Sequence, residues 1–272
     1  EQNSLHLPQQ ETNTQALMSF LKRLFGKRPL GGSATSHFDS PIAPAAPVFI
    51  IGDLHGCQPQ LTKLLDTMAA KDPTAPRVFV GDYVDRGEDS AAVLRTLFAM
   101  KDDPSVICLA GNHEDMMLGF LDHPETKGQR FLRYGGLQTL ASFGIGGVIN
   151  TSEGEALVVA CAALKDTMGH DIIDWLRTLP ATWQSGNLVV VHAGADPVTP
   201  LTLQSDKTFK WGHGDFATVL RTDGTWVAHG HTIVDTANTD GGKIALDTGA
   251  YATGLLTAAY VTAGDVTFLQ TR

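Results

Sequence analysis

The sequence predicts an α/β fold in which two packed, mixed β-sheets are flanked by helices, and two observations support this. In the first half, short apolar runs end in glycine-rich polar turns at intervals of about 30 residues, the length of a βαβ unit. After residue 187, short apolar runs alternate with glycine turns, a pattern typical of successive β-strands. A βαβ half followed by a strand-rich half favours two layered sheets.

The first half is expected to alternate strands and helices from about residue 47. Its strands are the apolar runs Val48–Gly52, Val78–Gly81 and Val106–Ala110. Its helices have apolar residues at helical spacing, and they are expected at Gln58–Ala70, from Asp89 to about Met100, and at Glu114–Leu121. Asp89 and Ser90 are residue types that cap helix N-termini, so the second helix should begin there.

Residues 129–179 are expected to form a helical insertion. Their apolar spacing is helical, and Gly135 with Gly136 and the glycines within 144–147 should form turns. We find no catalytic motif in this stretch. The later strands are expected at Asn187–His192, Trp226–His229, Lys243–Leu246, Gly254–Val261 and Val266–Gln270.

Residues 1–46 are expected to form an N-terminal tail outside the folded domain, which should cover residues 47–272. Within the tail, Leu17–Phe25 places apolar side chains at helical spacing beside basic ones, which predicts a short basic amphipathic helix. Such a helix could dock on its own domain, stay disordered, or contact a membrane surface or a partner. Residues 29–47 are rich in Gly, Pro, Ser and Ala, which predicts a linker.

The composition argues against several classes of protein. A net charge of −9 disfavours nucleic-acid binding, which needs a basic surface. No run of 18 apolar residues occurs, so no stable membrane insertion is expected. Cys57, Cys108 and Cys161 show no paired spacing, which favours a reducing, cytoplasmic location. The oligomeric state is left open.

Polar residues follow the expected strands at their carboxyl ends, where parallel strands share one edge of a sheet. They are Asp53 and His55; Asp82, Asp85 and Arg86; Asn112, His113 and Glu114; His192; and His229 with His231. Placing several carboxylates close together costs free energy unless a polar partner binds them. Carboxylates, imidazoles and an amide together suit Mn, Fe or Zn better than Ca or Mg. The residues alone therefore predict metal-assisted chemistry.

These motifs resemble those of the phosphoprotein phosphatase family of the metallophosphoesterase superfamily, in its bacterial serine/threonine protein phosphatase branch. They are Gly-Asp-Leu-His-Gly at 52–56, Gly-Asp-Tyr-Val-Asp-Arg-Gly at 81–87, Gly-Asn-His-Glu at 111–114, His-Ala-Gly at 192–194 and Gly-His-Thr at 230–232. The resemblance runs from about residue 48 to 250 in the family's order. It implies the layered α/β/β/α fold, with residues 47–272 as the catalytic domain.

The resemblance implies two divalent metal ions per chain, with Mn expected first and Fe or Zn as alternatives. The ligands would be Asp53, His55 and Asp82 for one ion, and Asp82 as a bridge with Asn112, His192 and His231 for the other. His231 is preferred over His229 because the family's Gly-His-Thr context surrounds it. A hydroxide bridging the metals would attack phosphorus in line.

The resemblance also implies catalytic roles. His113 would protonate the leaving group, Asp85 would hold and polarise its ring, and Arg86 would bind the phosphoryl oxygens. The family's second phosphate-binding arginine falls at His213, in Trp-Gly-His at 211–213. Substrate binding is therefore expected from Arg86 together with His213 or with Arg133, in Leu-Arg-Tyr-Gly-Gly at 132–136.

We expect a metal-dependent phosphomonoester hydrolase, first of all a serine/threonine phosphoprotein phosphatase that also cleaves small phosphomonoesters in vitro. The alternative is a symmetrical dinucleoside-polyphosphate hydrolase, a close relative that typically lacks the aspartate present here as Asp85. A monoester has a poor alkoxide leaving group, so the His113–Asp85 pair favours the first hypothesis. A third hypothesis, an inactive metal-bound adaptor, is disfavoured because no expected ligand is missing.

Overall fold

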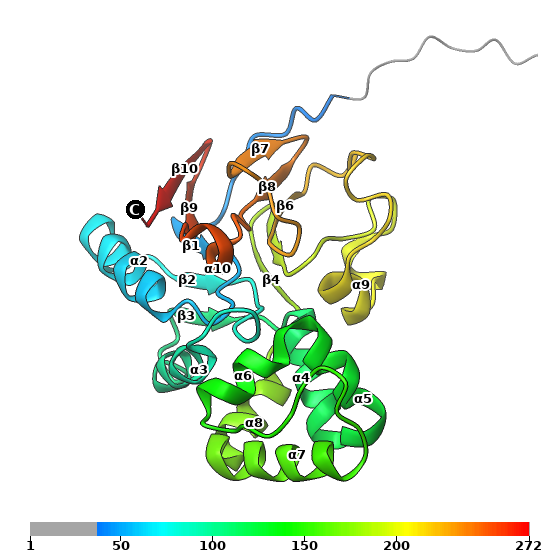
Figure 1. Ribbon diagram of the computed structural model, residues 1–272. Helices are drawn as coiled ribbons and strands as arrows, with labels where there is room; N and C mark the ends of the chain where they lie inside the picture. The colour runs from blue at the N-terminus through cyan, green and yellow to red at the C-terminus, as the bar shows by residue number, and fades with distance from the viewer. Residues whose placement is uncertain (1–36, 272) are drawn as a thin grey trace, which may run out of the picture. The chain divides into compact units, whose positions relative to one another are not determined.

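The computed structural model describes residues 37–271, so the amphipathic helix predicted at Leu17–Phe25 lies outside the described residues. Within them, two five-stranded mixed sheets form (Figure 1), as the sequence predicts. The first sheet has the order β10-β9-β1-β2-β3. Its strands are β1 (Val48–Ile51), β2 (Arg77–Phe79), β3 (Val106–Cys108), β9 (Thr257–Thr262) and β10 (Asp265–Gln270).

The second sheet has the order β4-β5-β6-β8-β7. Its strands are β4 (Thr182–Ser185), β5 (Leu188–Val191), β6 (Trp226–His229), β7 (Asn238–Asp240) and β8 (Lys243–Ala245). Each sheet has three neighbouring parallel strands: β1, β2 and β3 in the first, and β5, β6 and β8 in the second. In the first sheet, β9 and β10 pair antiparallel beside β1, which leaves β3 as an edge strand; in the second, β4 and β7 pair antiparallel at the two edges.

The alternation of side chains along each central strand builds the layers. In β1, Val48 and Ile50 pack between the sheets against Leu188 and Val190 of β5. Phe49 and Ile51 point to the opposite face, where they pack against the helices of the first half. Because successive strand side chains point to opposite faces, this continuous apolar run is buried on both sides. The result is the predicted order of helices, sheet, sheet and helix.

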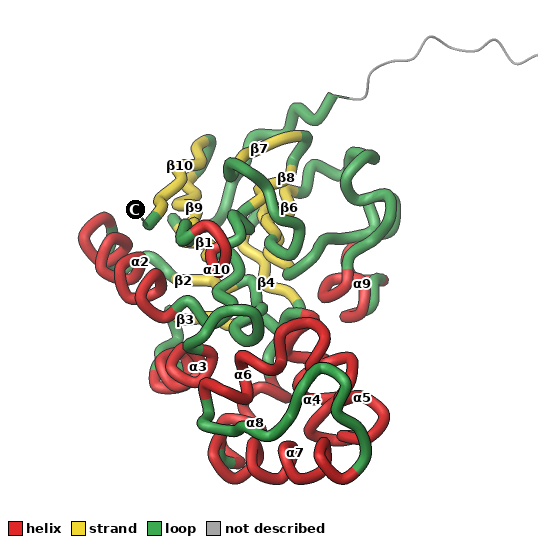
Figure 2. Tube along the Cα trace, viewed as in Figure 1, coloured by secondary structure: helices red, strands yellow, loops and turns green. Residues whose placement is uncertain are grey.

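Two groups of helices flank the first sheet (Figure 2). The βαβ crossovers are α2 (Gln58–Lys71) and α3 (Ser90–Ala99), and α4 (Asn112–Asp122) follows β3. The stretch predicted as an insertion contains α5 (Pro124–Phe131), a π-helical turn (Leu132–Gly136), α6 (Leu137–Ser142), α7 (Glu155–Met168) and α8 (His170–Thr178). These helices lie together beside α3 and α4 (Figure 1). No helix among residues 37–271 is long and apolar enough to cross a membrane.

Several local predictions need correction. At Gly135 and Gly136 the chain makes a kink between two helices and not an open turn, because Gly135 takes a non-helical φ of 114° and α6 begins directly after Gly136. Asp89 occupies the N-cap of α3 but makes no side-chain capping bond. Short polar elements were missed, since they carry little periodicity: β4, β7, α9 (Asp206–Trp211), α10 (Ala250–Thr253) and a 3-10 turn (Leu201–Leu203).

Part of the expected linker contacts the second sheet. The backbone N–H of Ala43 donates to the Asn187 side-chain oxygen at 2.7 Å, and that of Ala45 donates to the Ser185 hydroxyl at 2.9 Å. The indole N–H of Trp226 donates to the Ser40 carbonyl at 2.8 Å. Residues 40–45 therefore contact one end of the second sheet, at the turn between β4 and β5 and at the start of β6.

Candidate active site

The site lies where the central strands of both sheets end. Asp53 and His55 follow β1, and the turn containing Asp82, Asp85 and Arg86 follows β2. Asn112 and His113 form the first turn of α4, whereas the sequence predicted that this helix begins at Glu114. His192 and His231 follow β5 and β6. The two packed sheets thus bring together side chains as far apart in the sequence as Asp53 and His231, which are 178 positions apart.

The backbone at the site adopts conformations that ordinary residues avoid. Among the described residues, the non-glycine residues with positive φ are His55, Asp82, Asp85, Arg86 and His231, with φ between 39° and 72°. A left-handed conformation costs an L-residue about 1–2 kcal/mol. Such strain persists where surrounding structure enforces it, and it concentrates at functional sites. That every one of these residues belongs to the predicted site is independent support for a functional role here.

Asp82 lies at the centre of two groups of metal-binding side chains. The first contains His55, Asp82 and His113, and the second contains Asp82, His192 and His231. The Asp82 Oδ2 atom lies 3.5 Å from His55 Nε2, and its Oδ1 atom lies 3.3 Å from His192 Nε2. One carboxylate therefore faces both groups, as a bridging ligand must.

Asn112 and Asp53 each contact a residue of the second group. The Asn112 Oδ1 atom lies 2.9 Å from His192 Nε2. Both Asp53 oxygens accept the backbone N–H of His231, at 3.0 and 3.1 Å. A Cβ atom at Gly230 would collide with the Asp53 carboxylate, so this close approach requires glycine. His229 points elsewhere, because its ring packs on Phe216 and its Nδ1–H donates to the Gly230 carbonyl at 3.0 Å.

The electrostatics of these groups fit bound cations. Burial, then Asp247, then Asp82 raise the pKa of Asp53 well above its usual value. Burial alone would also raise the pKa of Asp82, but His192 and His113 hold it well below its usual value. Burial lowers the pKa of His55 to about 3 and that of His231 to about 4, so both rings are neutral ligands at neutral pH. The buried Nε2 atom of His55 has no hydrogen-bond partner. Crowded carboxylates, neutral imidazoles and an unpartnered ring nitrogen suit two divalent cations.

A second set of contacts links His113 to Asp85 and Arg86. The His113 Nδ1–H donates to Asp85 Oδ2 at 2.6 Å, and both side chains are fully buried. An Arg86 guanidinium nitrogen lies 3.1 Å from His113 Nε2. Burial opposes protonation of His113, yet Asp82 and Asp85 raise the pKa of the ring above its usual value. The predicted proton donor, its partner and the phosphate-binding arginine are therefore in mutual contact.

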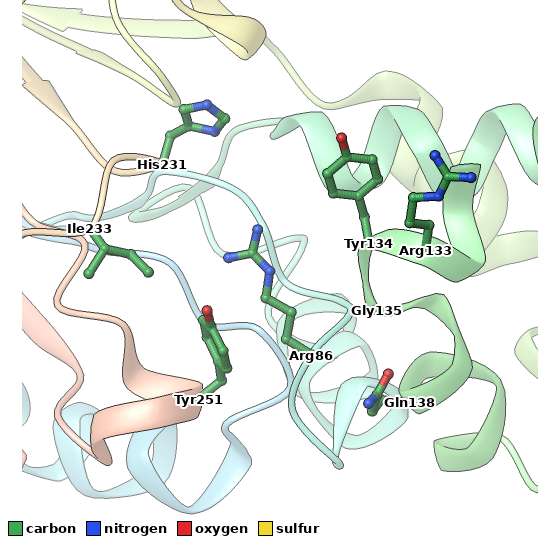
Figure 3. Close-up of a pocket in the computed structure, with 8 residues that line it drawn as sticks. All are labelled: Arg86, Arg133, Tyr134, Gly135, Gln138, His231, Ile233 and Tyr251. Carbon is green, nitrogen blue, oxygen red and sulfur yellow. The ribbon is translucent and has the colours of Figure 1, made fainter. Parts of the chain in front are cut away.

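A pocket of about 630 Å³ opens beside this set (Figure 3). Arg133, Tyr134, Gly135 and Gln138 line one side, and His231, Ile233 and Tyr251 line the other. Arg86 extends between the two sides (Figure 3). The Tyr251 ring packs on Arg86, with 5.1 Å between the guanidinium carbon and the ring centroid. Arg133 thus lines the same pocket as Arg86.

His213 does not line this pocket. Its ring lies 3.9 Å from Asp196, and its Nδ1 accepts the backbone N–H of Asp215 at 3.3 Å. The neighbouring Trp211 donates to Asp115, and so does Lys210. Of the two residues, Arg133 lines the same pocket as Arg86 and His213 does not.

Three buried side chains of the site were given no role from the sequence. Glu114 accepts the backbone N–H groups of Asp82, Tyr83 and Gly111 at 2.8–2.9 Å and so fixes the turn after β2. Asp247 follows β8, and one of its oxygens is buried without a partner. Thr139, from the predicted insertion, donates to Asp85. Only Glu114 had a signal in the sequence, its place in the Gly-Asn-His-Glu motif.

Two sheets with this set of ligands at their strand ends, and an arginine beside them, define a metal-dependent phosphoesterase. The chain belongs to the calcineurin-like phosphoesterase family, whose sequence pattern it matches over residues 46–235. It is 32% identical over 161 residues to a symmetrical bis(5'-nucleosyl)-tetraphosphatase of Janthinobacterium sp. (strain Marseille). This match covers 55% of the chain and 44% of the relative, so the chain spans less than half of the relative's length.

Solved structures agree on the fold. A candidate diadenosine tetraphosphatase superposes with a TM-score of 0.60 at 21% identity, covering 86% of this chain and 99% of that one. A serine/threonine protein phosphatase of Saccharomyces cerevisiae, similar to human phosphatase PP5, superposes with a TM-score of 0.53 at 16% identity. This superposition covers 84% of this chain and 80% of that one. The predicted superfamily and fold are confirmed. The predicted protein phosphatase branch is not, because the curated relative is a tetraphosphatase.

The positions of Arg133 and His213 predict different kinetics. Arg133→Ala should raise KM about tenfold with little change in kcat, since it removes one charge-assisted contact to bound phosphate. His213→Ala should change KM less than about twofold, because His213 lies outside the pocket. Steady-state kinetics on one phosphate ester test both variants. A larger rise in KM for His213→Ala would restore the role expected from the sequence.

Gly135 is predicted to be intolerant of a side chain. A Cβ atom there would lie 2.5 Å from the backbone N of Arg86, at a φ of 114°. Gly135→Ala should lower the free energy of unfolding by about 2–4 kcal/mol and displace Arg86. Gly144→Ala is the control, because Gly144 also has positive φ but a Cβ there meets no atom within 4 Å. Equal losses in urea denaturation would show that the contact with Arg86 is unimportant.

Proposed function

We propose that this chain hydrolyses symmetrical dinucleoside tetraphosphates into two nucleoside diphosphates. The observation that carries the proposal is the pocket, which combines two guanidinium groups with the exposed rings of Tyr134 and Tyr251 beside the metal ligands. Guanidinium groups suit a polyphosphate chain, and aromatic rings suit nucleobases. The similarity to a curated relative named as a symmetrical bis(5'-nucleosyl)-tetraphosphatase supports the same substrate class.

The residues of the chain divide the chemistry among them. Asp53, His55, Asp82, Asn112, His192 and His231 would hold two divalent cations. Such cations, when bound, lower the pKa of a water molecule and neutralise charge on the reacting phosphate. Arg86 would bind a phosphoryl oxygen, and Arg133 would bind phosphates farther from the reacting phosphorus. The Arg86 guanidinium group contacts His113 Nε2. If the guanidinium group turned to a bound phosphate, that nitrogen would be free to carry a proton.

A second candidate is a phosphomonoester hydrolase acting on phosphoserine or phosphothreonine, which the sequence alone favoured. Its support is the buried His113–Asp85 pair, held at 2.6 Å. An alkoxide needs a proton as it leaves, whereas a nucleoside diphosphate leaves readily without one. The adaptor hypothesis has least support, because all the expected ligands are present and the strained backbone is maintained.

Product analysis in ¹⁸O-labelled water tests the first proposal. The chain, loaded with Mn²⁺, should convert diadenosine tetraphosphate into ADP alone, with the label in one of the two ADP molecules. This follows because water attacks one inner phosphorus and the other ADP leaves. Formation of AMP and ATP would exclude symmetrical cleavage. No cleavage, together with turnover of a phosphoserine peptide, would establish the second candidate instead.

A further inference from the structure

Residues 133–139 connect the pocket with the proton donor. Arg133, Tyr134 and Gln138 line the pocket (Figure 3). Gly135 and Thr139, on the other side of the same helical turns, contact Asp85 and Arg86. Gly135 makes a kink between two helices here, with a non-helical φ of 114°. One short segment of the insertion therefore has both a substrate-facing side and a catalytic side.

Thr139 makes the contact on the catalytic side. Its side chain is fully buried, and its hydroxyl donates to Asp85 Oδ1 at 2.7 Å. The same hydroxyl oxygen accepts the backbone N–H of Asp85 at 2.9 Å. It therefore holds both the carboxylate and the backbone of Asp85, a residue in a strained conformation with a φ of 72°.

The two oxygens of Asp85 have separate partners. Thr139 contacts Oδ1, and His113 contacts Oδ2 at 2.6 Å. A carboxylate fixed at both oxygens cannot rotate without breaking one of these bonds, so the hydroxyl also fixes the plane in which Asp85 meets the ring. Ser90 adds a weaker anchor, because its hydroxyl accepts the Asp85 N–H at 3.1 Å but does not touch the carboxylate.

We propose that Thr139 is a positioning residue that orients Asp85, and through it His113, for proton transfer to the leaving group. The insertion would thereby take part in catalysis and would tie the substrate-binding side of residues 133–138 to the proton donor. The proposal rests on phosphoester hydrolysis by this chain, and not on which ester is the natural substrate.

The test uses aryl phosphates with leaving groups of graded basicity, from p-nitrophenyl phosphate to phenyl phosphate. Thr139→Val keeps the shape and removes the hydroxyl. It should lower kcat on phenyl phosphate about fivefold to tenfold, the effect of one buried hydrogen bond, and less than about twofold on p-nitrophenyl phosphate. KM should stay unchanged, and Thr139→Ser should restore kcat on both substrates.

Thr257→Val is the matched control, because Thr257 is equally buried and its hydroxyl is hydrogen-bonded to Thr248 at 2.8 Å. It should leave the dependence on the leaving group unchanged. Equal losses of kcat on all aryl phosphates in Thr139→Val would reduce Thr139 to a structural role, and an unchanged kcat on phenyl phosphate would overturn the proposal. Failure to cleave diadenosine tetraphosphate would refute the proposed function and leave this test intact.

Discussion

Asp82→Asn should abolish hydrolysis and cost the chain at least one bound metal ion. Asp82 belongs to both groups of metal-binding side chains, and its two oxygens face His55 and His192. A carboxylate can neutralise two cations, whereas a neutral amide cannot. Metal affinity should fall by more than about 100-fold, because mutating residues that only orient the ligands already lowers metal affinity by about 10–100-fold.

Metal analysis after dialysis, with calorimetric titration of Mn²⁺, measures this effect. Asp102→Asn provides the control, because Asp102 is an exposed carboxylate that belongs to neither group of candidate metal ligands. Two tightly held ions in Asp82→Asn would show that Asp82 is not the bridging ligand.

His113→Asn should reduce kcat most where the departing group is most basic. On a phosphoserine peptide we expect a loss of about 10²–10⁴-fold, the usual range for general acid catalysis. On p-nitrophenyl phosphate or a dinucleoside tetraphosphate the loss should be smaller, because those groups leave with less help. Asp85→Asn should show the same trend in weaker form, since Asp85 acts through the ring.

Metal content decides how the result is interpreted, because His113 lies in one of the metal-binding groups. Both variants should retain two ions, and His123→Asn, at an exposed histidine, should behave as the unchanged chain. Equal losses on all esters with full metal content would argue against proton donation and make His113 a stabiliser of charge.

The fold was predictable where hydrophobic burial repeats along the chain. The run Val48–Ile51 is buried on both faces, so its continuous apolar character marks a central strand. By contrast, β7 (Asn238–Asp240) is exposed at every position, and only its pairing with β8 makes it a strand. No pattern in the sequence records a pairing partner of that kind.

The candidate site was predictable where a residue type suited to metal binding stands in a recognisable local motif. Asp53, Asp82 and His231 stand in glycine-flanked turns, which is a local signal. Thr139 stands in an ordinary helical stretch, and its role depends on a contact across 54 positions. His213 shows the converse, because its matching position in a motif does not place its side chain in the lining of the pocket.

The most direct test of the account compares two substrates with one Mn²⁺-loaded preparation of the chain. The measured quantity is the ratio of kcat/KM for diadenosine tetraphosphate to kcat/KM for a phosphoserine peptide. The account predicts a ratio of about ten or more, because two guanidinium groups and two aromatic rings in the pocket should bind the larger substrate in its transition state. A ratio below one, or no turnover of either ester, would contradict it.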